Sequence, residues 1–130
     1  MMIESKKRIV YIEDNLDNRT LVARVLMAEG YEVITAASAQ EGLSVVATER
    51  PNLILIDINM PGTDGLTLTA KLRELEHLKG VAVVAITANV MKGDRERTLA
   101  AGCDGYIQKP INVDLLPQQV AKFIKEAHPL

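Results

Sequence analysis

The chain alternates short apolar runs with segments in which apolar residues recur every three or four positions. Short apolar runs are typical of buried β-strands, and the wider spacing is typical of helices that pack on one side. The expected strands are Arg8–Ile12, Tyr31–Ala36, Leu53–Asp57, Val81–Thr87 and Tyr106–Gln108. The expected helices are Leu16–Ala28, Ala39–Thr48, Leu66–Leu75, Lys92–Ala101 and Val113–Lys125. Strands that alternate with helices predict a parallel sheet joined by right-handed crossovers.

The strand patterns also predict the order of the sheet. The first, third and fourth expected strands are apolar along their whole length, which is typical of strands covered on both faces. The second carries Glu32 and Thr35 and the last is short, so we expect both at the edges. A flavodoxin-like three-layer sandwich follows, with five helices around a five-stranded sheet of order 2-1-3-4-5. Its ligand position lies at the carboxyl ends of the first and third strands.

Two helices have a distinct apolar face that we expect to be buried against this sheet. In the first helix the inward residues are expected to be Leu21, Val22, Val25 and Leu26. In the last helix they are expected to be Leu115, Leu116, Val120, Phe123 and Ile124.

Composition narrows the class of protein. With 130 residues, 48% hydrophobic and 25% charged, the chain is typical of one globular domain. Its net charge is -2 and its basic residues are scattered, which argues against a nucleic-acid partner. The apolar runs are too short to span a bilayer and the N-terminus lacks a signal-peptide core, so we expect no membrane partner and a cytoplasmic location. The single cysteine, Cys103, excludes an internal disulfide framework.

Polar side chains stand at four expected strand ends: Glu13-Asp14, Asp57, Thr87 and Lys109-Pro110. Each has an ordinary interpretation when taken alone, as a helix cap, a turn, a strand residue or a loop. The carboxyl ends of parallel strands meet at one edge of a sheet, however, so all four should lie together. Their joint occurrence predicts a functional site.

Three carboxylates in one cleft repel each other unless a cation neutralises them. Mg2+ suits them, because it takes oxygen ligands from one or two carboxylates and the rest from water and phosphate. The backbone carbonyl of Asn59 can add a ligand. Asp57 can then attack phosphorus to form an acyl phosphate. Lys109 can pair with one phosphoryl oxygen, and the Thr87 hydroxyl can donate to another.

The order of these residues resembles the receiver domains of two-component response regulators, the CheY-like domains, over essentially the whole chain. The segment Asp57–Gly65, Asp-Ile-Asn-Met-Pro-Gly-Thr-Asp-Gly, is similar to the phosphoacceptor loop of that family. The resemblance implies that Asp57 accepts phosphate from a histidine kinase or a histidine phosphotransfer protein, in a switch rather than a conventional enzyme. The implied ligands of Mg2+ are Glu13, Asp14, Asp57 and the Asn59 carbonyl. It also implies contact of Lys109 with the phosphoryl group and a cis peptide bond before Pro110.

Two stretches resemble a subset of the family. Asn15–Asn18 is similar to receivers of hybrid kinases and phosphorelays, which implies that Asn15, Leu16 and Asn18 face the kinase. Met91–Arg97, with Gly102-Cys103 and Tyr106-Ile107, resembles small stand-alone regulators of the DivK type. Because the last expected helix ends close to the last residue, we expect one receiver domain over residues 1–130 and no effector domain. A monomer or a weak phosphorylation-dependent dimer is the expected assembly.

The expected helix Lys92–Ala101 is polar, and weak apolar anchoring makes it the element most free to move. Phosphorylation adds about two negative charges beside Thr87 and Lys109. If Thr87 moves toward that group, Tyr106 gains room to turn inward and the surface of the fourth helix, fifth strand and fifth helix repacks. The resemblance makes this surface the site of a downstream protein target. In the alternative interpretation, Tyr106 is only a half-buried aromatic residue of an edge strand.

Two other functions remain open at this point. A Mg2+-dependent phosphohydrolase of the haloacid-dehalogenase type has a second aspartate two positions after its nucleophile, where this chain has Asn59. A binding module that works without phosphate would not need the acidic residues, Thr87 and Lys109. A dinucleotide-binding fold is disfavoured, because no Gly-x-Gly-x-x-Gly follows any expected strand.

Overall fold

A computed structural model of the chain describes residues 6–60, 64–88 and 92–127. Part of the expected phosphoacceptor loop, residues 61–63, therefore lies outside the described residues, as does Met91 at the start of the DivK-like stretch. None of the described helices is both long and apolar enough to cross a membrane.

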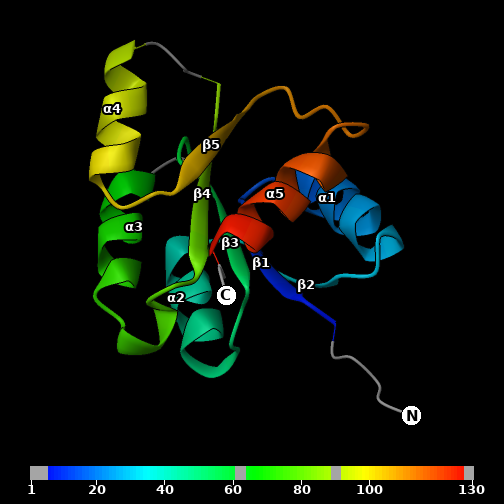
Figure 1. The fold of residues 1–130 in the computed structure, drawn as a ribbon, viewed down its shortest axis with the longest axis horizontal. Helices are drawn as coiled ribbons and strands as arrows, with labels where there is room; N and C mark the ends of the chain where they lie inside the picture. Colours follow the sequence, from blue (N-terminus) through cyan, green and yellow to red (C-terminus); the bar gives the residue numbers. More distant parts are fainter. Residues whose placement is uncertain (1–5, 61–63, 89–91, 128–130) are drawn as a thin grey trace.

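Five parallel strands form one sheet in the order β2-β1-β3-β4-β5 (Figure 1). The strands are β1 (Arg8–Ile12), β2 (Glu32–Ala36), β3 (Leu53–Asp57), β4 (Ala82–Thr87) and β5 (Gly105–Gln108). The helices are α1 (Leu16–Ala28), α2 (Ala39–Thr48), α3 (Gly65–Arg73), α4 (Lys92–Ala100) and α5 (Leu116–Ala127), and a 3-10 turn spans Glu76–Leu78. The predicted fold class and strand order are confirmed, with the two polar or short strands at the edges.

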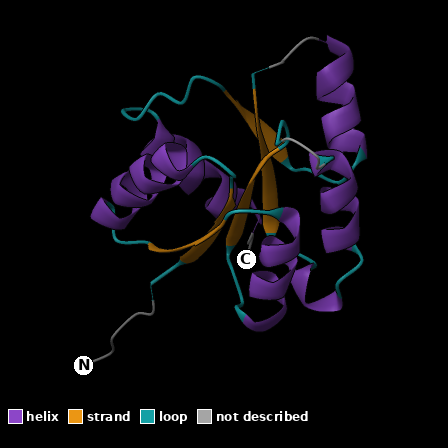
Figure 2. Ribbon diagram, turned by 180° about the vertical axis from the view of Figure 1, so that it is seen from behind, coloured by secondary structure: helices purple, strands orange, loops and turns teal. Residues whose placement is uncertain are grey.

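The sheet is covered on both faces (Figures 1 and 2). One face packs against α1 and α5, in a core that contains Tyr11, Val22 and Leu116. The other packs against α2 and α3, in a core that contains Ile12, Val46 and Leu72. Successive residues of β1 alternate between these two cores, as the period of a strand requires. A side chain near the end of β1 is thereby assigned to one helical layer or the other.

Two of the helices that begin at the site's edge of the sheet, α1 and α3, have side-chain caps. Asn15 begins α1, where its side-chain oxygen accepts the N–H of Asn18 at 2.9 Å. Asp64 begins α3 in the same way, accepting the N–H of Leu66 at 3.0 Å. The next residue, Gly65, packs against the backbone just after β3: a Cβ there would lie 2.5 Å from the Cα of Ile58. Glycine thus lets α3 start directly against the residue that follows Asp57.

The structure corrects some predicted boundaries and orientations. The predicted helix from Val113 begins only at Leu116, because Asn112 Oδ1 accepts the N–H groups of Asp114 and Leu115 and closes a turn there. Leu115 is therefore 47% exposed, and the prediction that it faces inward is wrong. Leu21 was also expected inward and is 46% exposed, on the flank of α1 that borders Ile111. The helix expected to reach Leu75 ends at Arg73 and continues as the 3-10 turn.

Candidate functional site

The four predicted strand ends meet at one edge of the sheet. Asp57 ends β3 and Thr87 ends β4, while Glu13 follows β1 and Lys109 follows β5. Glu13 still belongs to the strand ladder, since its N–H donates to the carbonyl of Ala36 at 2.9 Å. The site is therefore built on regular strands, whose backbone hydrogen bonds hold it in place.

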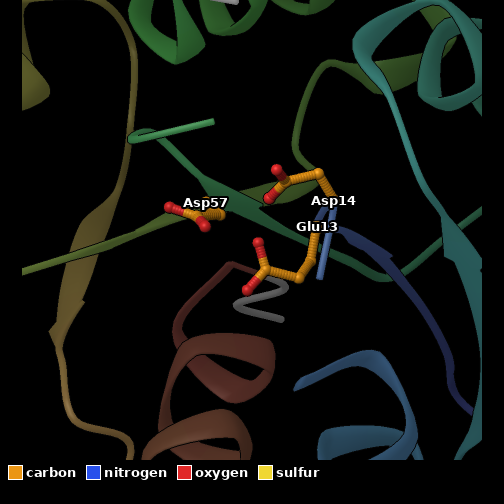
Figure 3. Close-up of side chains that lie close together, drawn as sticks. All are labelled: Glu13, Asp14 and Asp57. Atoms are coloured by element: carbon orange, nitrogen blue, oxygen red, sulfur yellow. The ribbon is translucent and has the colours of Figure 1, made fainter. Parts of the chain in front are cut away.

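Three carboxylates gather at this edge (Figure 3). Glu13, Asp14 and Asp57 each offer an oxygen, and these oxygens lie within 4.8 Å of one another. Glu13 is fully buried and Asp57 is only 3% exposed, whereas Asp14 lies at the surface. The cluster thus has a buried base and one open side.

Asp57 is held by two donors. Its Oδ2 accepts a hydrogen bond from Lys109 Nζ at 2.8 Å, and its Oδ1 accepts one from the N–H of Asn59 at 2.9 Å. Burial acts to raise the pKa of Asp57, but its interaction with Glu13 and the hydrogen bonds from Lys109 and the Asn59 N–H outweigh burial and lower that pKa below its usual value. Asp57 is therefore an anion at neutral pH, with its carboxylate fixed in direction.

Glu13 is held from α1. Its Oε1 accepts a hydrogen bond from Asn18 Nδ2 at 2.7 Å, and its backbone carbonyl accepts one from Arg19 Nη1 at 2.7 Å. Its other oxygen, Oε2, is buried and has no hydrogen-bond partner among the described residues. Burial and the proximity of the Asp57 carboxylate raise the pKa of Glu13 to about 7. Glu13 therefore keeps its proton to a higher pH than an ordinary glutamate does.

The donor set fits Mg2+. Three carboxylates face one another, and among the described residues one ammonium, that of Lys109, pairs with them. Negative charge is therefore in excess. The partnerless Oε2 of Glu13 is a hard oxygen at the base of the cluster, and hard oxygens are the ligands that Mg2+ prefers. Glu13, Asp14 and Asp57 are the residues that would hold the ion. That the Asn59 carbonyl joins them stays a prediction.

Thr87 and Asn59 lie on the side of the site that faces α4. Thr87 is 2% exposed. Both residues line a cavity of about 240 Å³, together with Arg97 and Thr98 of α4. The Asn59 side-chain oxygen accepts the N–H of Ala88 at 3.4 Å and so ties the end of β3 to the end of β4. A change at Thr87 is thereby adjacent to α4, as the predicted switch requires.

Tyr106 is half-buried on β5 and packs against the core on the α2–α3 face. The guanidinium carbon of Arg95, on α4, lies 5.3 Å from the centre of its ring, within the range of a cation–π interaction. Neither Arg95 nor Arg97 was singled out from the sequence. Alternating charges on a helix usually indicate only a solvated surface, so no sequence signal marked them.

The side of the site toward α1 and the loop after β5 contains a larger hollow than the side toward α4. The residues expected to face a kinase divide here: Leu16 is 65% exposed, Asn15 caps α1, and Asn18 is turned toward Glu13. A hollow of about 500 Å³ opens beside them. It is lined by Asn18, Leu21, Val22, Ala88, Lys109, Pro110 and Ile111. The Lys109–Pro110 peptide bond in its wall is cis, in agreement with the resemblance.

Sequence reasoning also missed Tyr11, which is fully buried beneath the acidic cluster with its hydroxyl partnerless among the described residues. The available signal was its position two residues before Glu13 on the same strand, since side chains at that spacing share a face.

Comparisons with known proteins agree with this geometry. A family model described as the response regulator receiver domain matches residues 9–121. The polar-differentiation response regulator DivK of Brucella ovis is 38% identical over 121 residues, which cover 93% of this chain and 98% of that protein.

Two solved structures extend the likeness. The chemotaxis protein CheY4 of Vibrio cholerae has a TM-score of 0.88 and 25% identity, over 92% of this chain and 99% of that one. The receiver domain of a sensor histidine kinase from Pseudomonas aeruginosa has a TM-score of 0.82 and 32% identity, over 92% of this chain and 98% of that one. In that structure a magnesium ion is coordinated in the active site cleft.

The raised pKa of Glu13 predicts how stability depends on pH without metal. The folded state favours protonated Glu13, so this contribution is complete below the ordinary pKa of 4.5 and is lost as pH rises through about 7. The loss should be on the order of 2–3 kcal/mol. The pKa of Asp57 is lowered instead, so its contribution is lost only in more acidic solution and stays constant here.

Urea unfolding in EDTA at pH 5 and pH 7.5 measures this difference. Glu13→Gln should remove most of the pH dependence, while Glu74→Gln, at an exposed position, should follow the wild type. Equal pH dependence in the Glu13→Gln protein and the wild type would mean that Glu13 is not the responsible group.

Proposed function

Because the chain belongs to the response regulator receiver family, we propose that Asp57 is the phosphate acceptor of a phosphorylation-controlled switch in two-component signalling. The observation that carries this proposal is the setting of Asp57. Its carboxylate is nearly buried, lies in an acidic cluster that suits a metal and is paired with Lys109 at 2.8 Å. A carboxylate kept anionic and aimed by two donors is prepared for attack on phosphorus.

The proposed reaction is a transfer between two side chains of different proteins. A carboxylate oxygen of Asp57 attacks the phosphorus of a phosphohistidine, the P–N bond breaks, and the leaving imidazole nitrogen takes up a proton. The product on this chain is an acyl phosphate. Such a transfer is catalysed by positioning and by neutralisation of charge, since the transferred group resembles metaphosphate.

The residues around Asp57 supply those two effects. Lys109 stays close enough to pair with a phosphoryl oxygen once Asp57 is phosphorylated, because its ammonium already contacts that carboxylate. Thr87 lies at the end of the adjacent strand and is proposed to donate its hydroxyl to a second oxygen. A magnesium ion, when bound by Glu13, Asp14 and Asp57, supplies neutralisation of the remaining phosphoryl charge. Slow self-dephosphorylation is the expected reverse of the switch.

The geometry gives less support to a phosphohydrolase. That chemistry uses a second carboxylic acid two positions after the nucleophile, and here Asn59 directs its side-chain oxygen to the N–H of Ala88. An amide in that contact neither donates nor removes a proton for a leaving group. The geometry therefore favours a signal-carrying acyl phosphate over a phosphohydrolase intermediate.

We propose that the phosphodonor approaches over α1 and the loop after β5. Leu16, Leu21, Val113 and Leu115 are exposed apolar side chains on these two segments. The 500 Å³ hollow lies between the segments and has Lys109 in its wall. Exposed apolar side chains around a hollow are typical of a protein-binding surface. A histidine kinase or histidine phosphotransfer protein is the proposed partner there.

We propose that the signal leaves through the opposite side, at α4, β5 and α5. The described part of α4 buries only Thr98, so polar contacts rather than apolar packing hold that helix. One of these contacts is the stacking of Arg95 on Tyr106. Movement of Thr87 toward a phosphoryl group would change the packing beside α4, and Tyr106 would exchange its place under Arg95 for one nearer the core. A downstream protein would bind according to that exchange.

A cytoplasmic location, the absence of an effector domain, and a monomer or weak phosphorylation-dependent dimer stay predictions.

Phosphate labelling tests the acceptor. Acetyl phosphate with Mg2+ should place one acid-labile phosphate on Asp57, visible by mass spectrometry of the intact protein and its peptides. Asp57→Asn should take up none, because an amide is not a nucleophile toward phosphorus. Asp64→Asn, at an exposed helix cap in the same loop, should label like the wild type. One equivalent of phosphate on Asp57→Asn would rule out the assignment.

The docking surface is tested by comparing two phosphodonors. Leu16→Ser should slow transfer from a phosphorylated histidine phosphotransfer protein by about tenfold, as for loss of an important interface side chain. It should not change labelling by acetyl phosphate, which needs no protein surface. Met27→Ser is the matched control, because Met27 is similarly exposed at the far end of the same helix. Equal slowing by both variants, or with both donors, would contradict this surface.

The switch is tested with beryllofluoride, a mimic of the phosphoryl group. Thr87→Ala should still bind it, but amide shifts around Arg95–Ala100 and Tyr106 should be much smaller than in the wild type. Arg95→Ala should act in the opposite direction, because loss of a contact of about 0.5–1 kcal/mol frees Tyr106. Its Tyr106 signals should lie closer to the bound positions before any mimic is added. A full wild-type shift in Thr87→Ala would exclude Thr87 as the coupling residue.

A further inference from the structure

Tyr11 is a polar residue at the centre of an apolar core. It stands in β1 and is fully buried among residues of α1 and α5, including Val22, Leu26 and Leu116. Its ring packs as a phenylalanine ring would. Its hydroxyl adds nothing to that packing, and burying a hydroxyl without a hydrogen bond is unfavourable. The hydroxyl therefore calls for a separate explanation.

The hydroxyl faces the acidic cluster. Tyr11 and Glu13 are two residues apart in the same ladder, so their side chains leave the sheet on the same face. Burial and then the charge of Glu13 raise the pKa of Tyr11 above its usual range. A tyrosine hydroxyl carries a proton that it can donate in a hydrogen bond.

Glu13 has one oxygen to receive that proton. Its Oε1 is taken by Asn18, whereas Oε2 is buried and partnerless, as is the Tyr11 hydroxyl, within the part of the chain that the structure describes. Two enclosed polar groups of complementary kind, a donor and an acceptor, thus lie on the same face of the same strand. A hydrogen bond between them would give each group the partner that it lacks.

We propose that Tyr11 is a positioning residue for Glu13. Its hydroxyl donates to Oε2 and, with Asn18 on Oε1, orients the carboxylate toward Asp14 and Asp57. The inference rests on the proposed function, because that orientation matters for the metal that the three carboxylates would hold. Hydrogen-bond partners of metal ligands typically change metal affinity by 10- to 100-fold. Tyr11 would then determine how tightly Mg2+ binds, without touching it.

The test is Tyr11→Phe, which removes one oxygen and keeps the ring. The Mg2+ dissociation constant, measured by titration of the amide spectrum around Asp14 and Asp57, should rise about tenfold. The matched control is Tyr31→Phe, which deletes the same atom from a half-buried tyrosine just before β2 and should stay within about twofold of wild type. Affinity of Tyr11→Phe within twofold of wild type would overturn the proposal.

A double variant separates positioning from a general effect on the core. In a Glu13→Ala background, with folding checked by the amide spectrum, adding Tyr11→Phe should not weaken Mg2+ further. The same tenfold loss in that background would show that Tyr11 does not act through Glu13, and would also overturn the proposal. If Glu13→Ala does not fold, Asn18→Ala replaces it, and Tyr11→Phe should then weaken Mg2+ by a different factor than in wild type, since both residues hold one carboxylate.

Labelling at saturating Mg2+ keeps the two proposals distinct. Tyr11→Phe should still take up one phosphate from acetyl phosphate on Asp57. If Tyr11→Phe leaves the Mg2+ affinity unchanged and labelling is intact, only the role of Tyr11 is contradicted. If the wild type takes up no label, the proposed function itself is contradicted.

Discussion

The crowding of three carboxylates, of which Asp57 is paired with Lys109, is the interaction on which the rest of this site depends. Asp57 and Glu13 are both buried, and a buried charge is stable only when it is paired and hydrogen-bonded. Lys109 pairs with Asp57, whereas burial raises the pKa of Glu13 to about 7. The cluster is therefore unbalanced in a way that both a divalent cation and a phosphoryl group can change. That imbalance is the source of the proposed sensitivity to phosphorylation.

The fold holds these charged side chains in place because the backbone around them is rigid. Regular strand hydrogen bonds hold the backbone of Asp57, Thr87 and Glu13, so their side chains cannot easily separate to relieve repulsion. Gly65 allows α3 to press against Ile58, and the N-terminal caps of α1 and α3 fix the loops nearby. The repelling carboxylates therefore stay within a few ångströms of one another, where a bound ligand can neutralise them. Short-range preorganisation of this kind favours reactions that depend on charge neutralisation.

In the proposed switch, the signal arrives on one side of the site and leaves from the other. The face toward α1 and the loop after β5 is a hollow with exposed apolar residues, and Lys109 reaches Asp57 from its wall. The face toward α4 is polar, with Thr87, Asn59 and Arg97 around a smaller cavity. Arg95 continues that polar contact to Tyr106. A donor bound on the first face, as proposed, would leave the second face free to rearrange.

Sequence pattern alone predicted the architecture and the residues that the structure brings together at one edge of the sheet. Apolar runs against helical spacing predicted every strand and helix and the sheet order, because burial of apolar side chains on both faces leaves few arrangements. Strand ends bearing Glu13, Asp57, Thr87 and Lys109 predicted the cluster, because parallel strands bring those ends to one edge. Only the tertiary structure decided what depends on three-dimensional neighbours. Leu115 is exposed because the side chain of Asn112 closes a turn, and Asn18 turns to Glu13. Arg95 covers Tyr106, and the Tyr11 hydroxyl is buried without a partner among the described residues. These contacts join residues through the angle and reach of single side chains. A periodic pattern carries no information about that geometry.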